Sequence, residues 1–152
     1  MLNRLRRLRN AARLRRVHAP AASPLPPPPP GGVEVDELMQ LARQSFLHLQ
    51  AAWDRADLGA LGHLATAPLL EDLRHQLSLR GPGPNRTEVL QLDARLLSLE
   101  DLQEALIASV EFSGLIREQH ERAAAPFREL WLLANVKAAG RGWKLARVQS
   151  LS

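Results

Sequence analysis

Chemistry in a protein needs particular residue types at particular spacings, and this chain offers few of them. Its 152 residues contain no cysteine, which excludes disulfides, thiolate metal sites and cysteine nucleophiles. No serine stands in a Gly-x-Ser-x-Gly elbow. The five histidines lack the i, i+4 spacing of a helical metal site: His18, His48, His63, His75 and His120. We therefore expect no metal and no cofactor.

Paired carboxylates are another common source of catalysis, and the sequence shows no clear acid–base pair. Asp93 is the one aspartate within a clear strand pattern. We predict that it lies on a solvated face together with Gln91 and Arg95. The chain is therefore not expected to be an enzyme. A small-molecule enzyme stays as an alternative, and it would need pKa-shifted carboxylates that line a cavity.

Basic residues are concentrated at the N-terminus. Residues 1–18 carry +7 and no acidic residue, whereas the other 13 basic and 16 acidic residues leave the rest of the chain at −3. The tail arginines are Arg4, Arg6, Arg7, Arg9, Arg13, Arg15 and Arg16. We predict that they bind an anionic membrane surface. Nucleic acid is the competing anion, and a solvated tail without a partner is a further alternative.

A proline-rich linker, residues 19–33, follows the tail. It contains seven of the eleven prolines, which predicts an extended polyproline II spacer rather than a folded element. A proline-rich ligand for a partner module is the alternative. No apolar run approaches the roughly 18 residues of a membrane-spanning helix. Arginines interrupt every leucine pair of the tail, so no secretory signal peptide is expected.

Five aromatic residues are candidates for lining a cavity or a partner site: Trp53, Phe112, Phe127, Trp131 and Trp143. The alternative interpretation is that these residues belong to the hydrophobic core, and we favour it for Phe112 and Trp131. Trp53 at a helix end and Trp143 after a turn are the better candidates for a rim. The tail contains no aromatic residue, so stacking on single-stranded nucleic acid has no platform.

The apolar spacing predicts three helices before any strand. Asp36 is expected to cap a helix that runs to about Trp53, with an apolar stripe at four- and three-residue steps. Asp57 is expected to cap a short helix. Thr66 and Pro68 mark the start of a third helix, which Gly81 should end.

Four strands are predicted to follow the helices. A period of two runs from Thr87, and its phase slips at Leu97 and Leu99, which indicates a bulge or the end of the strand. The range 104–118 alternates cleanly around Gly114, where a neighbouring backbone can approach closely. The range 127–136 is apolar on both parities, so we expect it to be covered on both faces. The last strand spans 143–151, and the order of elements predicts a segregated α+β fold.

Five stretches together resemble the bacterial Tim-forty-four-like domain, a family named for a peripheral subunit of the mitochondrial inner-membrane import motor. They are Phe46-x-x-Leu49-Gln50-Ala51-Ala52-Trp53-Asp54, Asn85-Arg-Thr-Glu-Val89 with Leu92-Asp93-Ala94, Phe112-Ser-Gly-Leu-Ile-Arg-Glu118, Pro126-Phe-x-Glu-x-Trp131 and Gly142-Trp143-x-Leu-Ala146. The resemblance covers residues 34–152. It implies a nuclear-transport-factor-two-like (NTF2-like) fold, in which a curved four-stranded antiparallel sheet and three helices form a cone with an apolar cavity.

The resemblance also implies a function. Members act as non-enzymatic scaffolds or tethers at the inner membrane, with lipid contact and a link to protein transport. We therefore expect a peripheral place at the cytoplasmic membrane, a partner from a transport system, and a cavity for a lipid tail or partner segment. A purely cytoplasmic location, a homo-oligomer and a ribosome- or RNA-associated adaptor stay open. Enzymes of this fold commonly use a tyrosine, which this chain lacks.

Overall fold

The computed structural model describes residues 33–80, 86–118 and 123–151. Three helices come first: α2 (Val35–Asp54), α3 (Leu58–Leu64) and α4 (Ala67–Arg80). Four strands follow: β1 (Thr87–Asp101), β2 (Ala105–Glu118), β3 (Ala125–Val136) and β4 (Trp143–Ser150). The predicted arginine tail, the predicted linker up to residue 32 and the predicted helix end at Gly81 lie outside the described residues.

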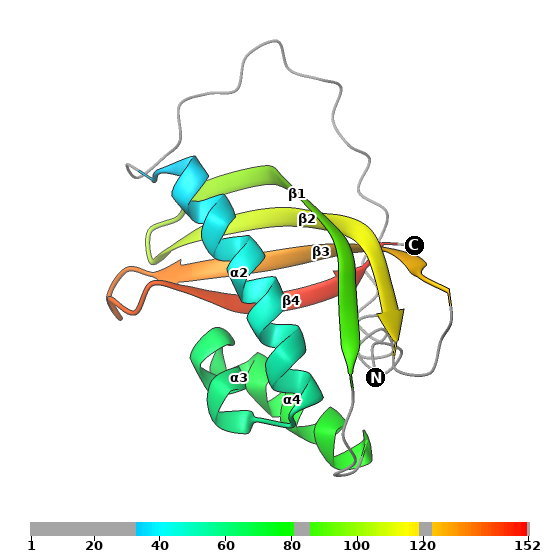
Figure 1. The fold of residues 1–152 in the computed structure, drawn as a ribbon. Helices are drawn as coiled ribbons and strands as arrows, with labels where there is room; N and C mark the ends of the chain where they lie inside the picture. The colour runs from blue at the N-terminus through cyan, green and yellow to red at the C-terminus, as the bar shows by residue number, and fades with distance from the viewer. Residues whose placement is uncertain (1–32, 81–85, 119–122, 152) are drawn as a thin grey trace.

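The four strands form one antiparallel sheet in the order β1-β2-β3-β4, in which each strand pairs with the next one along the chain. Figure 1 shows β1 and β2 bending strongly, with α2 crossing one face of the sheet and α3 and α4 lying at one end of it. This arrangement confirms the predicted fold class of three helices on a curved four-stranded antiparallel sheet.

Helix α2 supplies most of the helical contact with the sheet. Its inward stripe carries the predicted residues, and all of them are buried: Leu38, Ala42, Phe46, Leu49 and Trp53. The predicted cap was wrong. Glu34 caps the helix, and its carboxylate accepts a hydrogen bond from the backbone N–H of Asp36 at 3.4 Å. Asp36 lies in the first turn, where a negative side chain interacts favourably with the helix dipole.

Hydrogen bonds fix the start of α3 and tie the junction between α3 and α4 to the sheet. Asp57 caps α3 as predicted, because its Oδ1 accepts a hydrogen bond from the N–H of Ala60 at 3.0 Å. Between α3 and α4, the N–H of Thr66 donates to the carbonyl of Leu145 on β4 at 2.9 Å. This bond joins the helical layer to the edge of the sheet, so the helices cannot slide along β4 without breaking it.

Strand β1 contains two irregularities that help the sheet to curve. The pairing with β2 shifts register at Leu90 and again at Leu97, and the second shift confirms the bulge that the sequence predicted. Gly114 of β2 confirms the predicted close approach. A Cβ atom at this position would lie 1.9 Å from the backbone oxygen of Gln91 on β1. The two strands therefore approach here more closely than any side chain would allow.

Strand β3 differs from the prediction of two covered faces. One parity is buried against the helices and consists of Phe127, Glu129, Trp131 and Leu133. On the other parity Leu130 and Leu132 are only half-buried, so this face is not fully covered. The run of apolar residues suggested a strand that is covered by a layer on each face. The described helices, however, cover only one face of the sheet.

Candidate functional site

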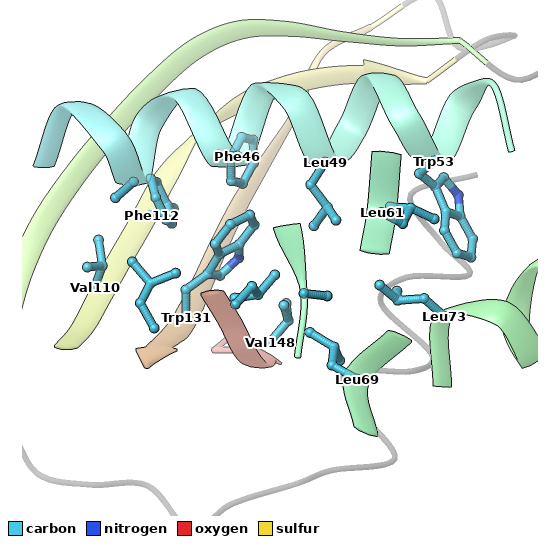
Figure 2. Packing of buried hydrophobic residues seen from close by; sticks show 14 of the residues in the cluster. Phe46, Leu49, Trp53, Leu61, Leu69, Leu73, Val110, Phe112, Trp131 and Val148 are labelled. Carbon is cyan, nitrogen blue, oxygen red and sulfur yellow. The ribbon is translucent and has the colours of Figure 1, made fainter. Parts of the chain in front are cut away.

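The inward face of the sheet is built around an aromatic cluster. The ring of Phe46, on α2, lies 4.9 Å from Phe112 and 5.2 Å from Trp131, measured between ring centroids. Phe112 and Trp131, on adjacent strands, meet edge to face at 4.9 Å. Such pairs stabilise a core beyond the area that they bury. Figure 2 shows Phe46 of α2 reaching down toward Trp131 and Phe112 of the sheet.

The structure brings together three of the five predicted aromatic candidates. Phe112, Phe127 and Trp131 all contact the Phe46 ring or one another. Phe46 was missed as the centre of this group, although its place on the apolar stripe of α2 was recognised. Phe112 and Trp131 are fully buried, as the core alternative predicted.

The other two candidates, Trp53 and Trp143, lie apart from the cluster. Trp53 is 0% exposed, so its predicted rim position is wrong; Figure 2 shows it beside Leu61 and Leu73, at the α3–α4 end of α2. Trp143 is half-buried and packs against the edge of the core. The helix end that carries Trp53 is covered because α3 and α4 fold back beneath it.

A buried carboxylate accompanies the aromatic cluster. Glu129 is 2% exposed, and its Oε1 accepts a hydrogen bond from the indole N–H of Trp131 at 3.0 Å. Glu129 was not predicted to be a site residue, although its parity with Phe127 and Trp131 places it on the inward face. A buried carboxylate needs donors to offset its desolvation, and the indole N–H supplies one of them.

A second carboxylate, Glu118, is also buried on the inward parity of β2 and is 8% exposed. Glu129 pairs in register with Phe112, six residues before Glu118 along the same strand. Six residues of strand span about 20 Å. The two buried carboxylates are therefore too far apart along the sheet to share a proton. Asp93 lies exposed on β1 beside Gln91, as predicted.

Polar groups also gather where α2 ends. The carboxylate of Asp54 accepts hydrogen bonds from the backbone N–H of Thr87 at 2.8 Å and from its hydroxyl at 3.2 Å. Arg80 donates to the carbonyl of Trp53, and its guanidinium carbon lies 5.7 Å from the centre of the indole ring. Burial raises the pKa of Asp54 above its usual value of 3.8, although the Thr87 hydrogen bonds and the charge of Arg80 act the other way.

The opposite face of the sheet carries charges in a row. Glu111 of β2 stands between two arginines from neighbouring strands, with Arg128 of β3 at 2.9 Å and Arg95 of β1 at 3.5 Å. Both arginine side chains are largely exposed, so this row stabilises the sheet only slightly.

The described residues show neither a metal-binding cluster nor a membrane-spanning helix. These residues contain no group of three or more histidine, aspartate or glutamate side chains that is arranged to hold a metal ion. Within the same ranges, no helix has the length and apolar character needed to cross a membrane. The seven tail arginines lie outside the described residues.

Comparisons with known proteins give a likeness of fold. No family model matches the sequence, and no curated protein matches it significantly. Among solved structures, the chain is similar to a nuclear transport factor 2 (NTF2-like) superfamily protein from Salmonella enterica serovar Typhimurium, with a TM-score of 0.48 and 10% sequence identity. The likeness covers 78% of this chain and 93% of that chain. At this identity it says nothing about a ligand or an activity.

Proposed function

We propose that this protein is a non-enzymatic scaffold or tether that works at an anionic membrane surface in association with protein transport. The observation that carries the proposal is the segregation of charge. Seven arginines stand among the first 18 residues without an acidic residue, and the rest of the chain has a net charge of −3. A basic segment joined by a proline-rich spacer to a mildly acidic domain can bind a surface while it holds that domain away from the headgroups.

The resemblance to Tim-forty-four-like domains supplies the link to transport. The stretches that resemble the family contain much of the aromatic cluster and its carboxylate, including Phe46, Phe112, Glu129 and Trp131. The family implies that the inward face receives a lipid tail or a partner segment. These rings are buried in the free protein, so such a ligand reaches them only when α2 moves away from the sheet.

Binding to vesicles tests the membrane part of the proposal. The variant replaces all seven tail arginines with glutamine in the full chain: Arg4, Arg6, Arg7, Arg9, Arg13, Arg15 and Arg16. The wild type should co-sediment with vesicles that contain anionic lipid and not with neutral vesicles, and the variant should lose most of this binding. Each arginine near the surface contributes about 1 kcal/mol at moderate salt. Equal binding by both proteins would rule out the tail as the anchor.

The same pair of proteins separates a membrane from RNA. If wild-type protein binds an unstructured RNA more tightly than anionic vesicles at the same salt concentration, the adaptor alternative is favoured over the tether. Entry of an acyl chain into the inward face can be followed separately by fluorescence. Replacing Trp53 and Trp143 with phenylalanine leaves Trp131 as the one tryptophan, and lipids with brominated chains should quench it. Unquenched Trp131 fluorescence in vesicle-bound protein would exclude lipid-tail entry.

A further inference from the structure

The amide of Gln50 is an unusual group in the core. Its side chain is 3% exposed, and neither its oxygen nor its nitrogen has a hydrogen-bond partner among the residues that the structure describes. The indole N–H of Trp53 is also buried and also lacks a partner within that part of the chain. Trp131 provides the contrast, because its indole N–H donates to Glu129.

Two neighbouring contacts locate Gln50 between the helix and the sheet. Phe46 contacts Phe112 of β2, and Asp54 bonds to Thr87, which pairs in register with Glu118 of β2. Gln50 is four residues from each of these two α2 residues, so it faces the sheet between the levels of Phe112 and Glu118. Trp53 follows Gln50 by three residues, a spacing that places two side chains on the same helix face.

Leaving these groups without partners would cost the fold a substantial part of its stability. A glutamine amide can make four hydrogen bonds, and an indole N–H can make one. More than nine in ten buried polar groups in proteins have a partner, from protein or from ordered water. A protein contains about one internal water per 27 residues, and such waters make about three hydrogen bonds to groups of this kind.

We propose that Gln50 and Trp53 form an internal binding site for one water molecule on the inward face of α2. The water accepts a hydrogen bond from the indole N–H of Trp53 and donates one to the amide oxygen of Gln50. Water can make both bonds at once, because its oxygen accepts from an N–H group while its own hydrogens are free to donate to an amide oxygen. The site depends only on the packing of α2 against the sheet, so it is independent of the proposed membrane function.

Nuclear magnetic resonance detects such a water directly. In protein with nitrogen-15-labelled tryptophan, the three indole N–H signals are assigned from single Trp→Phe variants. The Trp53 signal should show a cross peak with water, with the sign of a dipolar contact and not of hydrogen exchange. The Trp131 signal is the internal control and should show none, because its N–H is bonded to Glu129. Absence of a dipolar water cross peak at Trp53 would overturn the proposal.

Substitution of Gln50 tests whether its amide is the second hydrogen-bond partner of the water. Gln50→Leu keeps a side chain of similar size but removes the amide, so the water cross peak at Trp53 should disappear. Gln44→Leu makes the same change on the exposed face of the same helix and should leave the cross peak intact. If Gln50→Leu does not fold, Gln50→Met gives the same comparison with an unbranched side chain. A cross peak that survives unchanged in the Gln50 variant would overturn the assignment of this site.

Discussion

Trp131 acts in the aromatic cluster both as a packing group and as a hydrogen-bond donor. Its indole N–H bonds to Glu129, which is almost fully enclosed. Trp131→Phe keeps an aromatic ring but takes away this donor, so the variant should lose about 1–3 kcal/mol of unfolding free energy. Urea unfolding, monitored by circular dichroism, measures the loss.

Trp143 gives a comparison for that substitution at a less buried site. It is half-buried at the edge of the core, so Trp143→Phe should cost about 1 kcal/mol or less. The pair Trp131→Phe and Glu129→Met completes a double-mutant cycle, in which the two changes should be clearly non-additive because each of them removes the same hydrogen bond. Equal losses at the two tryptophans, or additivity in the cycle, would contradict a stabilising role for the hydrogen bond.

Asp54 makes stability depend on pH in an uncommon direction. Burial raises the pKa of its carboxyl above 3.8, so the folded state holds this proton more tightly than the unfolded chain does. The contribution of Asp54 is therefore complete below 3.8 and is lost as the pH rises through the higher native pKa. The wild type should lose stability relative to Asp54→Asn as the pH increases across this window. Urea unfolding midpoints of the two proteins, measured at several pH values from acid to neutral, give this difference in stability. A wild type that gains stability relative to Asp54→Asn as the pH rises would refute the prediction.

Periodicity in the sequence was enough to predict every described helix and strand, because each element has one buried face. The stripe of α2 and the alternation of β2 both follow directly from this requirement. The helix cap was less predictable. Glu34 and Asp36 are both acidic and stand two residues apart, and only the backbone conformation decides which of them precedes the first turn.

The site was predictable only in part. The aromatic residues were identified, but Trp53 was misplaced because a helix end looks exposed until the next two helices are known to cover it. Glu129 and Gln50 each occupy an inward position of a recognised element, so parity gave a signal for both. Glutamate and glutamine side chains are usually exposed in proteins, so their residue types argued against burial more strongly than their inward positions argued for it.

At the scale of the elements, Gly114 allows strands β1 and β2 to approach each other closely. A methyl group at this position would overlap the backbone of Gln91, at 1.9 Å from its oxygen and 2.7 Å from its carbon, so the β1–β2 pairing would have to separate. Gly114→Ala should therefore cost about 3 kcal/mol, at the upper end of overpacking effects, because backbone cannot move aside as a flexible side chain does. Thermal and urea unfolding would both show the loss.

The control for Gly114 lies in helix α3. Gly59→Ala places its methyl 3.5 Å from the nearest atom, Oδ1 of Asp57, which is an ordinary contact. Alanine also favours a helix, so this variant should be more stable by about 0.5–1 kcal/mol. If both glycine variants destabilised the protein to the same extent, the close approach of β1 and β2 would not be the cause.

At the scale of the whole molecule, the proposed membrane binding should depend on the position of the arginines more than on the total charge. The net charge of the chain is only +4, and its basic and acidic parts are separate in sequence. A membrane attracts the nearest charges most strongly, since attraction falls off within a Debye length of about 8 Å at physiological salt. Arginines of the folded domain should contribute little when a spacer holds that domain away from the surface.

Two variants with the same net charge test this difference. The first replaces Arg4, Arg6 and Arg7 of the tail with alanine, and the second replaces Arg43, Arg86 and Arg141, which are exposed on the domain. At about 1 kcal/mol per arginine, the tail variant should bind anionic vesicles up to about 150-fold more weakly. The domain variant should bind within about twofold of the wild type, because its charges lie beyond the screening distance. Similar losses in both variants would show that binding follows net charge, and the tail would then have no special role in the binding.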